Sequence, residues 1–154
     1  MKIVFLCAVA LGCGHSDAPE HKTGPLYPAP TGCMFKDTSF SLDQARIEPI
    51  VGGHVVLAPD QSDDTTCAFS DPQTKVVRVI VSYHAGGNFD SISADAFSMS
   101  NPPVPVQIGD EARYADFKNG KGGNLVVRSG NAVFVIGGSE HQAQYEQVAK
   151  LLVP

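Results

Sequence analysis

The stretch that decides the fold is residues 65–83, which read Thr-Thr-Cys-Ala-Phe-Ser-Asp-Pro-Gln-Thr-Lys-Val-Val-Arg-Val-Ile-Val-Ser-Tyr. Two strand-like runs, 65–70 and 75–83, flank the turn-forming segment Asp71-Pro72-Gln73-Thr74. Valine alternates along one face of the second run, and mostly apolar residues occupy its other face. This pattern is typical of a central strand that is covered on at least part of both faces. The sequence therefore predicts a β-hairpin whose second strand lies inside a sheet.

Upstream of this hairpin, Ser41 and Gln44 have the spacing of a capping box. They predict a short helix that ends before the pair Gly52-Gly53. The brief apolar run 54–58 predicts a strand, and the acidic segment 59–64 predicts a loop.

Downstream of the hairpin, residues 89–99 place apolar side chains at helical spacing, with Ser91 or Ser93 as the candidate cap. We therefore expect a helix there. The proline-rich segment 101–105 that follows predicts a stiff, extended connector.

The C-terminal part of the chain predicts three more strands and a last helix. The expected strands are 111–117, 125–128 and 132–136. The last two form a hairpin around Ser129-Gly130-Asn131, and Gly137-Gly138 ends the sheet. Ser139 and Gln142 have the spacing of a second capping box, which predicts a helix running to about Leu152.

The N-terminal residues 1–13, Met-Lys-Ile-Val-Phe-Leu-Cys-Ala-Val-Ala-Leu-Gly-Cys, have the pattern of an export signal. One cation precedes a short apolar run, which is too short to span a bilayer because spanning takes ~20 residues. Leu11-Gly12-Cys13 resembles the lipobox of bacterial lipoproteins, although Ala10 stands where that family most often has leucine. We predict a signal peptide at 1–12 and lipidation of Cys13. An ordinary secretory signal is one alternative, and a true start of translation upstream of Met1 is the other.

The following segment, 13–32, predicts a flexible tether between the lipidated cysteine and a single globular domain at 33–154. It is polar and proline-rich and has no helical or strand periodicity. Four of its side chains could bind a metal weakly, but nothing preorganises them, so a solvated tether is favoured. They are His15, Asp17, Glu20 and His21.

Composition limits the partners of the domain. The apolar fraction of 43% is enough for a core. The formal net charge of −5 and the absence of a basic cluster argue against nucleic acid as a partner. The chain has no tryptophan and only 8% aromatic residues, so it is poorly supplied for stacking on sugars or bases.

The export prediction determines the expected state of each cysteine. Cys7 leaves with the signal peptide and Cys13 takes the lipid, so Cys33 and Cys67 remain as an even pair in an oxidising compartment. A disulfide is the favoured interpretation. A two-cysteine metal site would need C-x₂-C spacing or adjacent histidines, which are absent, and free thiols are the other alternative.

Hairpins dominate this pattern of elements, and no βαβ unit is required. The sequence therefore predicts the α+β class: an antiparallel β-sheet packed by two to three α-helices, with one disulfide.

The layout from residue 33 to 152 resembles a domain family of unknown function found in small bacterial lipoproteins. The shared pieces are the lipobox, the proline-rich tether, Cys33, Cys67-Ala68-Phe69, Ile108-Gly109-Asp110-Glu111-Ala112, Val127–Val133 and the amphipathic segment 140–152. The chain departs from the family at Phe69, where tryptophan is usual. The resemblance implies a disulfide that joins the first helix region to the sheet, a sandwich of the PsbP-like type, and no known activity.

No catalytic motif is present: the chain lacks G-x-S-x-G, S-x-x-K, H-E-x-x-H, C-x-x-C and the P-loop pattern. Weaker candidates remain. Gly137-Gly138-Ser139 could bind an anion before a helix, and His84 lies at a strand end beside a glycine-rich loop, where it could be a ligand or a general base. A strand end with a helix cap, and an exposed polar loop, are the favoured interpretations.

Two clusters of acidic residues are equally weak candidates for a functional site. Asp110 and Glu111 are adjacent and would point to opposite faces of a strand, which is a poor arrangement for an acid/base pair. Asp60, Asp63 and Asp64 could coordinate calcium, but the loop lacks the alternating pattern of calcium-binding loops. Solvated surface charge is the favoured interpretation of both groups.

We therefore expect a lipid-anchored protein of the bacterial cell envelope that is not an enzyme and needs no metal or cofactor. Its domain would bind an envelope protein, or a small apolar ligand held between helix and sheet. If the host has an outer membrane, Gly14 after the lipidated cysteine favours its periplasmic face. The alternatives are an envelope hydrolase, which would need His54, His84 or His141 near a carboxylate, and a periplasmic metal carrier that uses the tether histidines.

Overall fold

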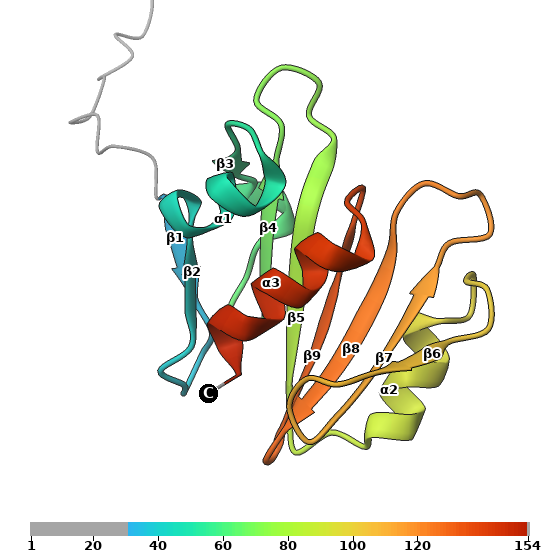
Figure 1. Ribbon diagram of the computed structural model, residues 1–154. Coiled ribbons are helices and arrows are strands. Elements are labelled where there is room, and N and C mark those ends of the chain that lie inside the picture. The colour runs from blue at the N-terminus through green and yellow to red at the C-terminus, as the bar shows by residue number, and fades with distance from the viewer. Residues whose placement is uncertain (1–30, 154) are drawn as a thin grey trace, which may run out of the picture.

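The computed structural model describes residues 31–153 (Figure 1). The predicted signal peptide, the lipidation site at Cys13 and nearly all of the predicted tether lie outside the described residues. The helices are α1 (Gln44–Val51), α2 (Phe89–Ala96) and α3 (Gln142–Leu152), with a 3₁₀ turn η1 (Pro59–Gln61). The strands are β1 (Gly32–Met34), β2 (Ser41–Asp43), β3 (Val56–Leu57), β4 (Thr66–Ser70), β5 (Val77–Ala85), β6 (Val104–Val106), β7 (Glu111–Asp116), β8 (Gly123–Ser129) and β9 (Ala132–Gly138).

Seven of the strands form one antiparallel sheet in the order β3-β4-β5-β9-β8-β7-β6. β1 and β2 form a separate two-stranded sheet. The predicted α+β class is therefore confirmed, and so are the two predicted hairpins, β4–β5 and β8–β9. The longest strand, β5, lies inside the sheet between β4 and β9, as its two-sided apolar pattern predicts.

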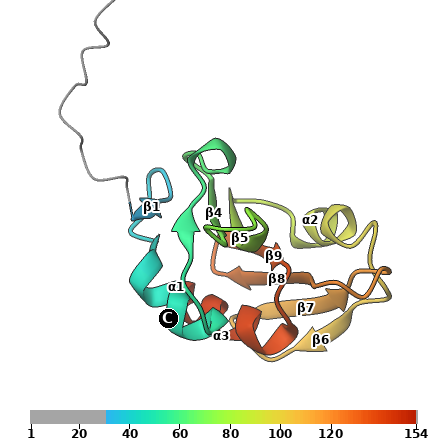
Figure 2. The ribbon, with the colours of Figure 1, turned by 90° about the horizontal axis from the view of Figure 1, so that it is seen from above.

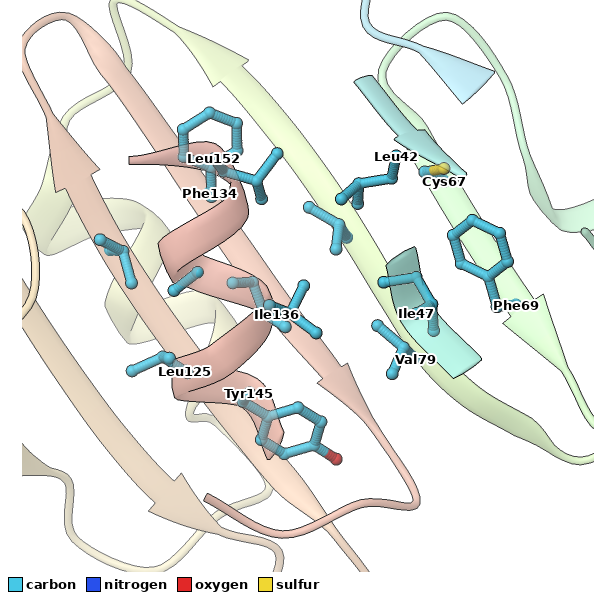
Figure 3. Close-up of a cluster of buried hydrophobic side chains, with 14 of the residues drawn as sticks. Leu42, Ile47, Cys67, Phe69, Val79, Leu125, Phe134, Ile136, Tyr145 and Leu152 are labelled. Carbon is cyan, nitrogen blue, oxygen red and sulfur yellow. The ribbon is translucent and has the colours of Figure 1, made fainter. Parts of the chain in front are cut away.

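One face of the sheet carries the main core (Figures 2 and 3). α1 and α3 lie on this face, which we call the covered face. α3 turns one stripe of side chains inward: Tyr145, Val148, Ala149 and Leu152. This stripe has the i, i+3, i+4, i+7 spacing of an amphipathic helix, and it packs on the fully buried Leu125, Phe134 and Ile136 of the sheet.

The predicted disulfide joins Cys33 of β1 to Cys67 of β4, with a Cα–Cα distance of 6.0 Å. It links the small sheet, which leads directly into α1, to the seven-stranded sheet. The Cys67 side chain is fully buried in the main core.

The opposite face of the sheet, which we call the half-covered face, carries only α2 (Figure 2). Phe89 of α2 packs on Val126 of β8 and Val133 of β9 in a second, smaller core. α2 ends at Ala96, earlier than the predicted helix at 89–99. Its eight residues cover β8 and β9 and leave the same side of β4 and β5 open.

Three predicted helix caps are wrong. Ser41 belongs to β2, where it pairs with Met34, and Asp43 caps α1 by accepting from the Arg46 amide at 3.0 Å. α2 is capped by Asn88, whose side chain accepts from the Ser91 amide. At α3, His141 occupies the cap position without a side-chain hydrogen bond, in place of the predicted Ser139.

The segment 101–105, expected as a connector, contributes the edge strand β6. Proline has no N–H, and Pro105 is tolerated here because β6 is an edge strand in which Val104 and Val106 pair with Tyr114 and Ala112 on either side of it. The opposite side of the sheet is closed by the 58–63 loop, where the Asp63 amide donates to the Thr66 carbonyl at 2.8 Å. The 58–63 loop thus bonds to the part of β4 that the two-residue strand β3 leaves unpaired.

Candidate functional site

The open part of the half-covered face forms a groove of about 430 Å³ between α2 and the strands β4 and β5. Its lining consists of Thr65, Thr66, Ser82, Tyr83, His84, Ile92, Asp95, Ala96 and Val135. We call this the α2 groove. Its volume lies within the roughly 300–1,000 Å³ typical of pockets for small ligands.

The strand side of the groove is polar because of the alternation of β5. Val79 and Val81 point into the main core, so Ser82 and His84 point to the other side. Ser82 pairs across the strands with Thr66, and their hydroxyl oxygens lie 3.5 Å apart. A strand that is apolar over most of its length thus ends in polar side chains, and this change coincides with the part of the sheet that no helix covers.

The helix side of the groove is mostly apolar, with Ile92 and Ala96 beside Asp95. Gly87 lies close under Ile92, and a larger residue at this position would displace the end of the Ile92 side chain. Asn124 of β8 donates from Nδ2 to the Ala96 carbonyl at 2.6 Å, which fixes the end of α2 over the sheet. The helix wall is therefore attached at both ends.

Two arginines hold the start of α2 on the side away from the groove. The Arg113 guanidinium lies 4.9 Å from the ring centre of Phe89 and pairs with Asp90 at 2.9 Å. It also pairs with Glu111 at 2.7 Å, and Arg128 pairs with Glu111 at 3.3 Å. These cations are engaged with carboxylates of the protein itself.

The loop before β4 supplies the remaining wall through Thr65. Its hydroxyl donates to Asp63 Oδ1 at 3.0 Å, and its amide donates to the same oxygen at 2.7 Å. Hydrogen bonds from the Thr65 amide and hydroxyl lower the pKa of the Asp63 carboxyl, so the loop is held by an ionised acceptor. The weaker, calcium-binding interpretation of this loop gains no support, because residues 31–153 contain no group of three or more ligands that could hold a metal ion.

The groove brings together Ser82, His84 and Asp95, three residue types that form a nucleophile relay in hydrolases. Within the described part of the chain, no hydrogen bond joins His84 to either of the other two. The trio therefore offers separate polar contacts and is not an assembled relay.

The other histidine candidates lie away from the groove. His54 is exposed and bonds through Nδ1 to the Glu48 carboxylate, which also accepts from Gln44 at 3.0 Å. Hydrogen bonds from Gln44 and then His54 lower the pKa of Glu48. No serine, threonine or cysteine side chain bonds to His54 among residues 31–153. His141 is exposed at the start of α3.

The weaker, anion-binding interpretation of Gly137-Gly138-Ser139 gains no support, and the favoured strand end is present. The two glycines belong to β9, and the position beyond them is taken by a buried carboxylate of the chain, Glu140. Glu140 pairs with Arg78, which also donates to the Val51 carbonyl at the end of α1 at 2.9 Å. A register shift between β4 and β5 at Phe69/Ser70 lies beside this arginine. This ion pair ties α1 to the sheet, and its carboxylate would repel an anion at this position.

Asp110 and Glu111 also have structural partners. Asp110 Oδ2 accepts from the Gly130 amide at 2.7 Å and fixes the β8–β9 turn, while Glu111 pairs with the two arginines beside α2. Of the groove residues, only His84 was a candidate from the sequence, as a weak one at a strand end; Thr66, Ser82, Asp95 and the apolar wall were not predicted. The only signal for them was the change from valine to serine and histidine at the end of β5.

No helix within residues 31–153 has the length and apolar character needed to cross a membrane. No protein-family model, curated protein or solved structure matches the chain.

Proposed function

We propose that this protein is a lipid-anchored binding domain of the bacterial cell envelope, which holds a small ligand in the α2 groove. The observation that supports binding is the groove itself: half of one sheet face is left without a helix, and its side chains are polar where they face the opening. The anchor part of the proposal rests on the signal-like run and on Cys13.

The groove has the mixed character expected of a ligand site. Ile92, Ala96 and Val135 offer apolar surface, while the hydroxyls of Thr66 and Ser82 and the side chains of His84 and Asp95 offer directional contacts. Apolar area supplies affinity of about 25 cal/mol per Å² removed from water, and the few polar groups orient the ligand. A ligand bound here would bridge α2 and the strands without disturbing the main core on the other face.

The anchor would keep this domain near the membrane while the tether lets it turn. A single acyl chain gives marginal membrane binding, since each buried CH₂ contributes about 0.8 kcal/mol, and several chains on Cys13 would make the attachment stable. Replacing Cys13 by serine is expected to release the protein from the membrane fraction.

The test is native and intact mass spectrometry of the full chain extracted gently from its own membrane. We expect acylation at Cys13, an oxidised Cys33–Cys67 pair and a reproducible extra mass from the bound ligand. The Ala96→Phe variant fills the groove and should lose that mass. Ser91→Phe is the matched control, because Ser91 is exposed on the same helix and does not line the groove.

Different outcomes separate the parts of the proposal. An unprocessed chain with free thiols would overturn the anchor. An acylated chain whose extra mass persists in Ala96→Phe would move the binding site away from the groove. If the acylated chain carried no small molecule but retained another protein, the domain would bind a protein partner and not a small ligand.

A further inference from the structure

The charges around the α2 groove indicate which ligands it would accept. No lysine or arginine lines the groove, and its one carboxylate is Asp95. The nearby cations have partners elsewhere: Arg113 and Arg128 pair with acidic residues on the far side of Phe89, and Lys36 pairs with Asp64 at 3.9 Å. An anionic ligand would find no lysine or arginine in the groove, where His84 is the one basic side chain.

Asp95 itself is free for a ligand. Within residues 31–153, its carboxylate takes part in no ion pair and no side-chain hydrogen bond. It also lies in the last turn of α2, which contains no basic residue. The carbonyl end of a helix carries partial negative charge, so Asp95 and the helix end both favour a cation at the same place.

The hydroxyls of the groove point to a ligand that donates hydrogen bonds. Thr65 uses its hydroxyl proton on Asp63, which leaves the lone pairs of its oxygen as acceptors. Thr66 and Ser82 lie 3.5 Å apart, so one hydroxyl can donate to the other and still accept from a ligand. An ammonium group has three donor hydrogens and no acceptor, which complements this set.

We infer that the α2 groove binds a small organic ammonium: a cationic amine on an apolar body. The ammonium group lies against Asp95 and the strand hydroxyls, and the body lies against Ile92, Ala96 and Val135. This inference rests on the proposed function, because it assigns a ligand class to the same groove.

The experiment compares three probes of similar shape and different charge: phenethylamine, phenethyl alcohol and 3-phenylpropionate. Each is titrated at millimolar concentration into the full chain with labelled methyl groups, and the NMR signals of Ile92 and Val135 report occupancy of the groove. We expect phenethylamine to bind most tightly. Asp95→Asn should lower the affinity for phenethylamine about fivefold, because a charge-assisted contact at a half-open surface is lost.

Asp90→Asn is the matched control, because Asp90 is on the same helix but pairs with Arg113 outside the groove. The Asp90→Asn variant should bind phenethylamine with the same affinity as the unmodified chain. Equal binding of the alcohol or of the propionate, or an unchanged affinity in Asp95→Asn, would overturn the ammonium assignment and leave the groove as a binding site. If none of the three probes shifts the two methyl signals, the ammonium assignment fails, and the mass retained by the native protein and lost in Ala96→Phe then decides the proposed function separately.

Discussion

The two faces of the seven-stranded sheet differ in how completely they are covered. On the covered face, α1, α3 and the small sheet bury large apolar side chains, and the disulfide and the Arg78–Glu140 ion pair attach these layers to the strands. On the half-covered face, one eight-residue helix buries Phe89, and the neighbouring strands show hydroxyls and an imidazole to solvent. The covered face contains most of the buried core, and the half-covered face leaves polar side chains accessible to a ligand.

This difference also shows which substitutions the domain should tolerate. Side chains of the covered face fill a close-packed interior, where even one methylene matters. Those of the α2 groove lie against open space, so their loss leaves no sealed cavity. Neighbouring residues of a single strand alternate between the faces and allow a direct comparison.

Phe134 and Val135 of β9 give the largest expected contrast. Phe134 is fully buried in the main core, and Val135 is partly exposed in the groove. Phe134→Ala should lower the free energy of unfolding by about 4–5 kcal/mol, and Val135→Ala by about 1 kcal/mol. Urea unfolding followed by circular dichroism measures both. Equal losses at the two positions would show that the faces contribute equally to stability.

The disulfide should have the next largest effect, because it cross-links 34 residues of chain on the covered face. Replacing both cysteines by alanine should lower the free energy of unfolding by about 3–4 kcal/mol, mainly through the greater freedom of the unfolded chain. The methyl signals of Ile92 and Val135 in the groove should stay unchanged in the folded variant. If the variant kept its stability and its groove signals changed, the disulfide would support the groove and not the covered face.

A pH dependence should come from the tyrosines of the covered face. Burial raises the pKa of Tyr145 to about 12, from an ordinary value of 10.0. Burial and the neighbouring Asp116 also raise the pKa of Tyr114. Below pH 10 both the folded and unfolded states keep the phenol protons, so the stabilisation is complete. Above that pH the unfolded state ionises first, and stability is lost.

For Tyr145 this loss amounts to about 2 kcal/mol by pH 12. Tyr145→Phe should reduce the loss, because phenylalanine has no phenol to ionise. Urea unfolding at about pH 9 and about pH 11 measures the difference. An identical loss in Tyr145→Phe would assign the effect to other groups.

The covered face was easier to predict than the groove, for physical reasons. Alternation along 75–83 and the turn at 71–74 are local signals, and they located the β4–β5 hairpin and the central strand. Export chemistry and an even number of cysteines predicted the disulfide. The α2 groove depends instead on which strands α2 covers, and nothing local to residues 89–96 specifies β8 and β9 rather than β4 and β5.

Two of the errors share one cause, which is that strand pairing outweighed local preference. Ser41 is a good cap by sequence, but it pairs with Met34, and Asp43 takes the cap position. Segment 101–105 has prolines that disfavour a strand, yet an edge position needs donors on one side only, and Val104 and Val106 supply them. In both cases the deciding partner lies elsewhere in the chain.

The smallest predicted effect tests whether the open face is kept polar at a cost in stability. Ser82 is half-buried in the middle of the sheet, a position where β-branched apolar residues are favoured. Ser82→Val should therefore raise the free energy of unfolding by about 0.5–1 kcal/mol. It should also lower the affinity for phenethylamine, since the groove loses a hydrogen-bond acceptor. Ser82→Thr keeps the hydroxyl and should retain binding. A loss of stability in Ser82→Val would mean that the contact between Ser82 and Thr66 supports the sheet, and the polarity of this face would then need no ligand to explain it.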